Sequence, residues 1–200
     1  MLRIIGSTGK GSRSIPLPPD YAGQIPAFDY IWQSFEDPAD IEAALQSSYS
    51  EHHGTLSSSF LAQLLTQIAR AQGMQDKLHD AQAALYKAKW KSDEKVAVVR
   101  LDLETARLRR LQDRTEEAMT LLKKVYETAA EAPLDYFKAD AAHILYLFEP
   151  DGGPEEGKTW SDAVLEIARN SGNIKTRRWA AVVLTDQGWK LFKNRIIQTI

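Results

Sequence analysis

The 200-residue sequence contains no cysteine. The chain can therefore form no disulfide, no thiolate zinc site and no cysteine nucleophile, and this fits a reducing compartment such as the cytoplasm. An excess of one charge is also lacking, because 25 lysines and arginines face 27 aspartates and glutamates for a formal net charge of −2. No broad positive field is available to hold a phosphate backbone, so we expect no binding to nucleic acid.

Long apolar runs are missing as well. A membrane-spanning helix needs roughly 20 mostly apolar residues, whereas the longest apolar stretches here are AAHILYLF and WAAVVL. The N-terminal sequence MLRIIGSTGKGS offers too few apolar residues for a secretory signal. We therefore expect a soluble, cytoplasmic protein that does not bind a membrane.

The alternating pattern of β-strands is almost absent, apart from the short segment LRII. From Asp37 onward, apolar residues instead recur at spacings of three and four, which predicts an all-α fold. The short breaks between the segments indicate helices packed as antiparallel hairpins. The predicted helices cover approximately residues 37–52, 55–73, 76–91, 94–112, 114–130, 134–148, 155–171 and 175–193.

Residues 1–26 concentrate glycine, serine and proline, and we interpret them as a flexible or extended N-terminal arm. Residues 27–200 form the predicted helical repeat domain, with an incomplete last repeat. The arm contains GSTGKGS, but only two residues separate Gly6 from Gly9, whereas a phosphate-binding loop needs four before its Gly-Lys pair. We expect no nucleotide or other cofactor.

The chain resembles itself after a shift of 37 residues. The shift aligns QIARAQGMQDKLHDAQAALYKA with ETARLRRLQDRTEEAMTLLKKV. It places Ala69 on Ala106 and Ala81 on Ala118, so small residues recur where neighbouring helices must approach closely. A two-helix repeat of this length is typical of solenoids built from helical hairpins.

These segments resemble tetratricopeptide repeats, which carry a small residue in helix A and alanines in helix B. DAAHILYLFEP with EEGKTWSDAVLEIA resembles a third unit, and RRWAAVVLTDQGWKLF resembles the start of a fourth. Residues 28–193 are also similar to a group of uncharacterised microbial and fungal tetratricopeptide-repeat proteins. The resemblance implies helical hairpins stacked as a right-handed superhelix, an α-solenoid, whose A helices line a concave groove that binds a protein or peptide.

Polar residues of the predicted A helices are the candidates for contact with a partner. We expect the partner-binding residues to be Gln67, Arg70, Arg100, Glu104, Arg107, His143, Tyr146 and Arg178. Arginine dominates this set, and guanidinium groups make paired hydrogen bonds with carboxylates. We therefore expect a non-catalytic adaptor or scaffold with an acidic protein or peptide partner. The arginines could instead pair with acids on their own surface.

One alternative is a small helical enzyme. Asp140, His143 and Tyr146 lie one helical turn apart on one predicted face, where a general acid–base pair could act. A metal site is not expected, because adjacent His52 and His53 would point about 100° apart on a helix.

Another alternative is a regulatory subunit that forms a homodimer through its C-terminal segment. The exposed apolar end of a solenoid needs a cap or a partner. Apolar residues at this end are Phe192, Ile196, Ile197 and Ile200.

The five tryptophans are at positions 32, 90, 160, 179 and 189. We expect most of them to be packing anchors between hairpins.

Overall fold

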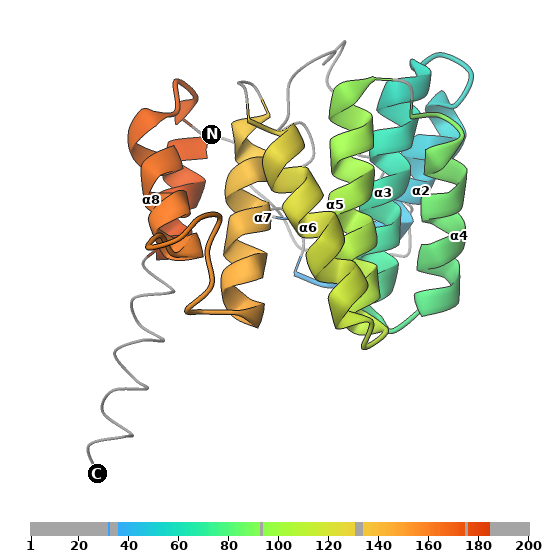
Figure 1. Ribbon diagram of the computed structural model, residues 1–200. Coiled ribbons are helices and arrows are strands. Elements are labelled where there is room, and N and C mark those ends of the chain that lie inside the picture. Colours follow the sequence, from blue (N-terminus) through green and yellow to red (C-terminus); the bar gives the residue numbers. More distant parts are fainter. Residues whose placement is uncertain (1–31, 33–35, 93, 131–133, 175, 185–200) are drawn as a thin grey trace.

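The computed structural model describes residues 32, 36–92, 94–130, 134–174 and 176–184. Within these ranges the protein is all-α, and its helices pack in sequential antiparallel pairs (Figure 1). Both predictions are thus confirmed. The helices are α2 (Pro38–His52), α3 (Ser58–Met74), α4 (Leu78–Lys89), α5 (Lys95–Leu111), α6 (Thr115–Thr128), α7 (Asp135–Phe148) and α8 (Trp160–Asn170). Residues 176–184 are also helical.

Figure 1 shows α8 and α7 at one end of the molecule, α6 and α5 in the middle, and α2, α3 and α4 at the other end, where α3 packs against both α2 and α4. Helix α5 packs against α3 and α4 on one side and against α6 and α7 on the other, so it connects the two halves of the molecule. The first helices of successive pairs, α3, α5 and α7, contact one another in turn. The predicted arm at residues 1–26 and the predicted C-terminal apolar segment lie outside the described residues. Among the described residues, no helix is both long and apolar enough to cross a membrane.

The apolar core has two parts that meet at α5. One part lies among α2, α3 and α4 and also includes Leu108 of α5. The other runs from Leu103 of α5 through α6, α7 and α8 to residues 176–184. The four alanines aligned by the 37-residue shift are all buried, which confirms that small residues stand where the helices approach closely.

The turn after α3 has a defined hydrogen-bond pattern. The amide of Lys77 donates to the carbonyl of Gln72 at 3.0 Å, and the amide of Asp76 donates to the carbonyl of Gly73 at 3.1 Å. Asp76 has a left-handed backbone, with φ of 59°. This combination is the Schellman ending of a helix, in which the residue after the C-cap adopts positive φ.

The turn after α5 repeats this pattern 37 residues later. The amide of Arg114 donates to the carbonyl of Arg109 at 2.9 Å, and the amide of Asp113 donates to the carbonyl of Arg110 at 3.1 Å. Asp113 has φ of 58°. The internal repeat is therefore a repeat of backbone geometry as well as of sequence.

Glycine at either left-handed position should stabilise the fold. An aspartate Cβ is crowded at positive φ, so we expect Asp76→Gly and Asp113→Gly each to raise the free energy of unfolding by about 0.5–1 kcal/mol. Urea denaturation measures the change. Asp80→Gly, in the first turn of α4, is the matched control and should destabilise by about 1 kcal/mol. Destabilisation by all three substitutions would contradict the strain argument.

The N-terminus of helix α2 is capped by the residue before it. The Asp37 side chain accepts a hydrogen bond from the Ala39 amide at 2.8 Å, and Pro38 occupies the first turn. An N-cap of this kind satisfies one of the amides that a helix start leaves without a partner.

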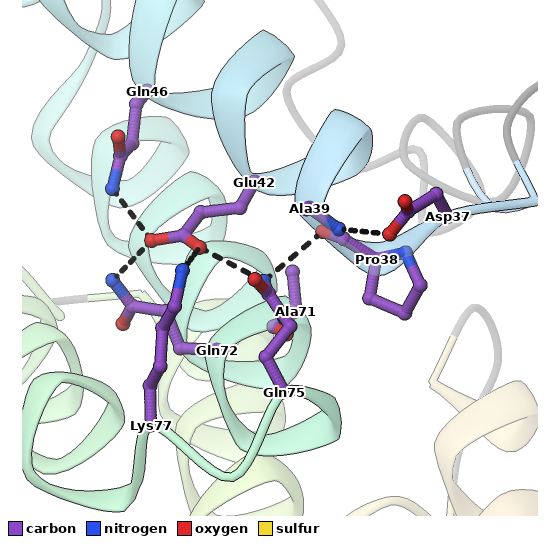
Figure 2. A network of polar contacts seen from close by, with 9 residues as sticks. All are labelled: Asp37, Pro38, Ala39, Glu42, Gln46, Ala71, Gln72, Gln75 and Lys77. Carbon is purple, nitrogen blue, oxygen red and sulfur yellow. Dashed lines mark hydrogen bonds and ion pairs between the residues drawn. The ribbon is translucent and has the colours of Figure 1, made fainter.

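A buried carboxylate ties α2 to the end of α3. Glu42 is only 8% exposed, and its two oxygens accept four hydrogen bonds (Figure 2). Gln46 and Gln72 both donate to Oε1 at 2.9 Å. Gln75 donates to Oε2 at 2.8 Å, and the Lys77 amine donates to the same oxygen at 2.7 Å. The turn after α3 is thereby fixed against α2.

The predicted start of α8 at residue 155 is wrong. The helix begins at Trp160, because Thr159 and Asp162 form a capping box: the Asp162 amide donates to Thr159 Oγ1 at 3.1 Å, and Asp162 Oδ2 accepts from the Thr159 amide at 2.9 Å. Gly157 lies in the loop with φ of 75°, a conformation that ends any helix.

The four described tryptophans comprise three partly or fully buried residues and one exposed residue. Trp160 is buried, and its ring packs edge-on against Tyr126 of α6 at 5.3 Å between centroids. Trp90 is 75% exposed and contacts Tyr86 of α4 in an edge-to-face pair. Trp90 is thus an exception to the expectation that most tryptophans anchor the packing, because it lies at the C-terminal end of α4 on the solvent side.

Candidate partner-binding site

The polar side of α3 is buried, not open to solvent. Every residue from Ser59 to Ala69 is buried, including the polar residues Gln63, Thr66 and Gln67. A helix buried all round has neighbours on all of its sides. Of the two predicted partner-binding residues on α3, Gln67 is therefore covered in this structure, whereas Arg70 is partly exposed.

One described side chain on this face is Trp32. Its indole Nε1 donates a hydrogen bond to Gln67 Oε1 at 2.8 Å, and Gln67 is only 1% exposed. The Arg70 guanidinium lies over the indole ring, 4.4 Å from its centroid. The two predicted residues Gln67 and Arg70 thus hold one aromatic side chain between them.

A charged cluster joins α5 to α7. The Arg107 guanidinium donates to Glu104 Oε1 at 2.6 Å on its own helix and to Asp140 Oδ2 at 2.5 Å on α7. Both carboxylate side chains are buried. Burial alone would lower the pKa of Arg107, but attraction to Asp140 and Glu104 outweighs it and raises that pKa above its usual value. Arg107 remains charged and bridges two helical pairs.

Arg100 provides a second contact between these pairs. It is buried, and its guanidinium lies over the Phe137 ring of α7, 4.9 Å from the centroid. Cation–π contacts of this kind are strongest when they are shielded from water. Three predicted partner-binding residues, Arg100, Glu104 and Arg107, therefore form the junction between α5 and α7.

The remaining predicted residues lie apart from this junction. The His143 ring packs edge-on against Trp179, 6.3 Å between centroids, where α7 meets residues 176–184. Tyr146 is 5% exposed and belongs to the apolar core. Arg178 is exposed and lies on the same side of its helix as exposed Val182.

The row of Asp140, His143 and Tyr146 thus divides among three environments. Asp140 is bound to Arg107, His143 lies against Trp179, and Tyr146 packs in the core. Within the described ranges, no group of three or more histidine, aspartate or glutamate side chains is suited to hold a metal ion.

An open pocket of about 500 Å³ lies among α6, α7, α8 and the loop before α8. The Lys158 amine in its wall is paired with Glu155 and Glu166, and the Asp135 carboxylate accepts from Ser171 Oγ at 2.5 Å. The charges of Lys158, Glu155 and Glu166 are therefore paired with one another, and Asp135 is hydrogen-bonded to a hydroxyl. The lining residues are Tyr126, Ala130, Asp135, Lys138, Pro154, Glu155, Lys158, Ala163, Glu166, Ile167, Asn170, Ser171 and Gly172.

Sequence reasoning missed this pocket. Lys138 of α7, which lines it, has its amine over the Tyr126 ring of α6, 4.6 Å from the centroid. Burial raises the pKa of Tyr126, although nearby Lys158 opposes the shift. The only signal for the pocket was the loop EPDGGPEEGK, which indicates an interruption but no site.

The comparisons add no relative. No family model matches the chain, and neither a curated protein nor a solved structure matches it. The function must therefore be argued from the geometry of the chain itself.

Proposed function

We propose that this protein is a non-catalytic adaptor or scaffold, a tetratricopeptide-like α-solenoid in the cytoplasm that binds a protein or peptide. The inner face is defined here as the polar sides of α3, α5 and α7 around Gln67, Arg70, Arg107 and Asp140. The proposal is supported by two turns of the same geometry 37 residues apart and by the contacts of α5 with α3 on one side and α7 on the other. Such stacks place one side chain row beside the next and bind extended segments.

The inner face has the chemistry of a recognition surface. A solenoid needs only apolar contacts and small residues between its hairpins, yet α3 and α5 bury Gln67, Arg100 and Glu104 here. Buried polar groups fix the relative orientation of neighbouring elements more closely than apolar contacts do. We infer that this rigidity holds the inner face in one shape for a partner.

Arg70 is the guanidinium best suited to an acidic partner. Arg107 is neutralised by Glu104 and Asp140, and Arg100 lies against Phe137. Arg70 is half-exposed, and its described contact is the uncharged Trp32 ring. Arg110 on α5 is exposed as well. An acidic segment that crosses α3 and α5 would therefore meet two positive charges that no described acid pairs with.

Selection of a displayed random-peptide library tests this proposal. Peptides selected on the wild-type protein should contain acidic residues and should bind Arg70→Glu about tenfold or more weakly, because a charge-assisted contact is lost. Fluorescence polarisation measures the affinities. Lys87→Glu, which makes the same charge change at an exposed position of α4, is the control and should bind like wild type. Equal affinity of all three proteins would refute the inner face as the binding surface.

A further inference from the structure

The contacts of Trp32 satisfy both kinds of recognition that an indole offers. An indole has one N–H donor and a flat ring with a negative face. Gln67 supplies the acceptor at 2.8 Å, and Arg70 supplies the cation at 4.4 Å from the ring centroid. The partly buried Trp32 side chain also packs against the apolar core among α2, α3 and α4.

The acceptor is deeply placed and held. Gln67 is 1% exposed, and its amide nitrogen lies 3.4 Å from Thr66 Oγ1. That contact orients the amide so that Oε1 is directed at the indole, and a buried acceptor loses much if its donor is removed. Phenylalanine could fill the same space but would leave Gln67 Oε1 without its hydrogen bond. The geometry therefore discriminates a tryptophan from phenylalanine, which has no donor for this acceptor.

We propose that Gln67 and Arg70 form a tryptophan-recognition site on the inner face, and that Trp32 occupies it until a tryptophan from a partner segment takes its place. The partner segment in this inference rests on the proposed adaptor function, whereas the site itself rests on the contacts of Trp32. When a side chain of the same chain fills the site, a competitor can bind only to the fraction of molecules in which the site is empty. Its apparent affinity is reduced in proportion to that fraction. Trp32 thus acts as an internal competitor.

The first test replaces the occupant and offers a free one. Trp32→Ala should gain about 2–4 °C in melting temperature with millimolar N-acetyl-L-tryptophanamide, whereas the wild-type melting temperature should not change. N-acetyl-1-methyl-L-tryptophanamide lacks the indole N–H, so it should give a markedly smaller shift with Trp32→Ala. Equal shifts in the two proteins, or equal shifts with the two probes, would overturn the proposal.

A milder variant covers the case in which Trp32→Ala does not fold. Trp32→Phe keeps most of the ring volume and removes the donor to Gln67, so it is a weaker competitor. Ligand-observed NMR should show that N-acetyl-L-tryptophanamide binds Trp32→Phe about tenfold more tightly than wild type. The same affinity for both proteins would exclude Trp32 as a competitor for the site.

A third measurement separates the site from the proposed function. Peptides selected on Trp32→Phe should be enriched in tryptophan and should bind this variant more tightly than wild type. Selected peptides without tryptophan would overturn the assignment of the partner residue while leaving an adaptor function in place. Probe binding by Trp32→Ala without any selected peptide would support the site and count against the adaptor function.

Discussion

Replacement of Arg107 by methionine is expected to lower the free energy of unfolding by about 3–5 kcal/mol, the range for breaking a buried ion pair. Methionine retains the side-chain volume but leaves the buried carboxylates of Glu104 and Asp140 without their cation. Urea denaturation measures the loss.

The matched control for this prediction is Arg110→Met. Arg110 lies on the same helix one turn further on and is exposed, so its replacement should change stability by no more than about 0.5 kcal/mol. Adding Asp140→Asn to Arg107→Met should recover part of the stability, because one uncompensated charge is removed. Strictly additive losses in the double variant would show that the two residues do not interact.

Replacement of Glu42 by glutamine should destabilise the fold by about 2–3 kcal/mol, since a buried acceptor of charge-assisted hydrogen bonds is lost. In one orientation, the new amide would place an NH2 group against the donors of Gln75 and Lys77. In the other, its uncharged carbonyl would accept from them more weakly than the carboxylate does. Chemical denaturation at neutral pH measures the change. Glu127→Gln, at an exposed position of α6, is the control and should be nearly silent.

The same carboxylate makes stability depend on pH. Burial raises the pKa of Glu42, but hydrogen bonds from Lys77, Gln72 and Gln75 outweigh this effect, so the folded-state pKa lies below the usual 4.5. A lowered folded-state pKa stabilises the protein above the unfolded-state pKa, and this stabilisation is lost as the pH falls through the folded-state pKa. Wild type should therefore lose more stability than Glu42→Gln below about pH 4.5. Parallel pH profiles would contradict this role of Glu42.

Most of the fold follows from local patterns in the sequence. Apolar spacing located the helices, Asp37 and Pro38 marked the start of α2, and the shift of 37 residues located two turns of the same geometry. The start of α8 was missed because EEGK reads as helix-forming, while the capping box of Thr159 and Asp162 begins the helix later. Local capping chemistry outweighed intrinsic propensity there.

The sequence indicated which polar residues lie on α3 and α5, but it did not indicate that they are buried or which residues they contact. Polar side chains at helical spacing predicted Gln67, Arg70, Arg100, Glu104 and Arg107, and these residues lie on α3 and α5, which contact each other. Their burial could not be predicted, because it depends on contacts between residues far apart in sequence. Gln67 and Trp32 are 35 positions apart in the sequence, and Arg107 and Asp140 are 33 positions apart. No local pattern reports such pairings.

Photocrosslinking of a bound peptide tests the central claim most directly. A selected peptide that carries benzophenone is irradiated on the wild-type protein, and the crosslinked residues are identified by mass spectrometry. The adaptor account predicts crosslinks on α3 and α5, close to Arg70 and Arg110. Crosslinks confined to α4 and α6, or to the pocket among α6, α7 and α8, would contradict it.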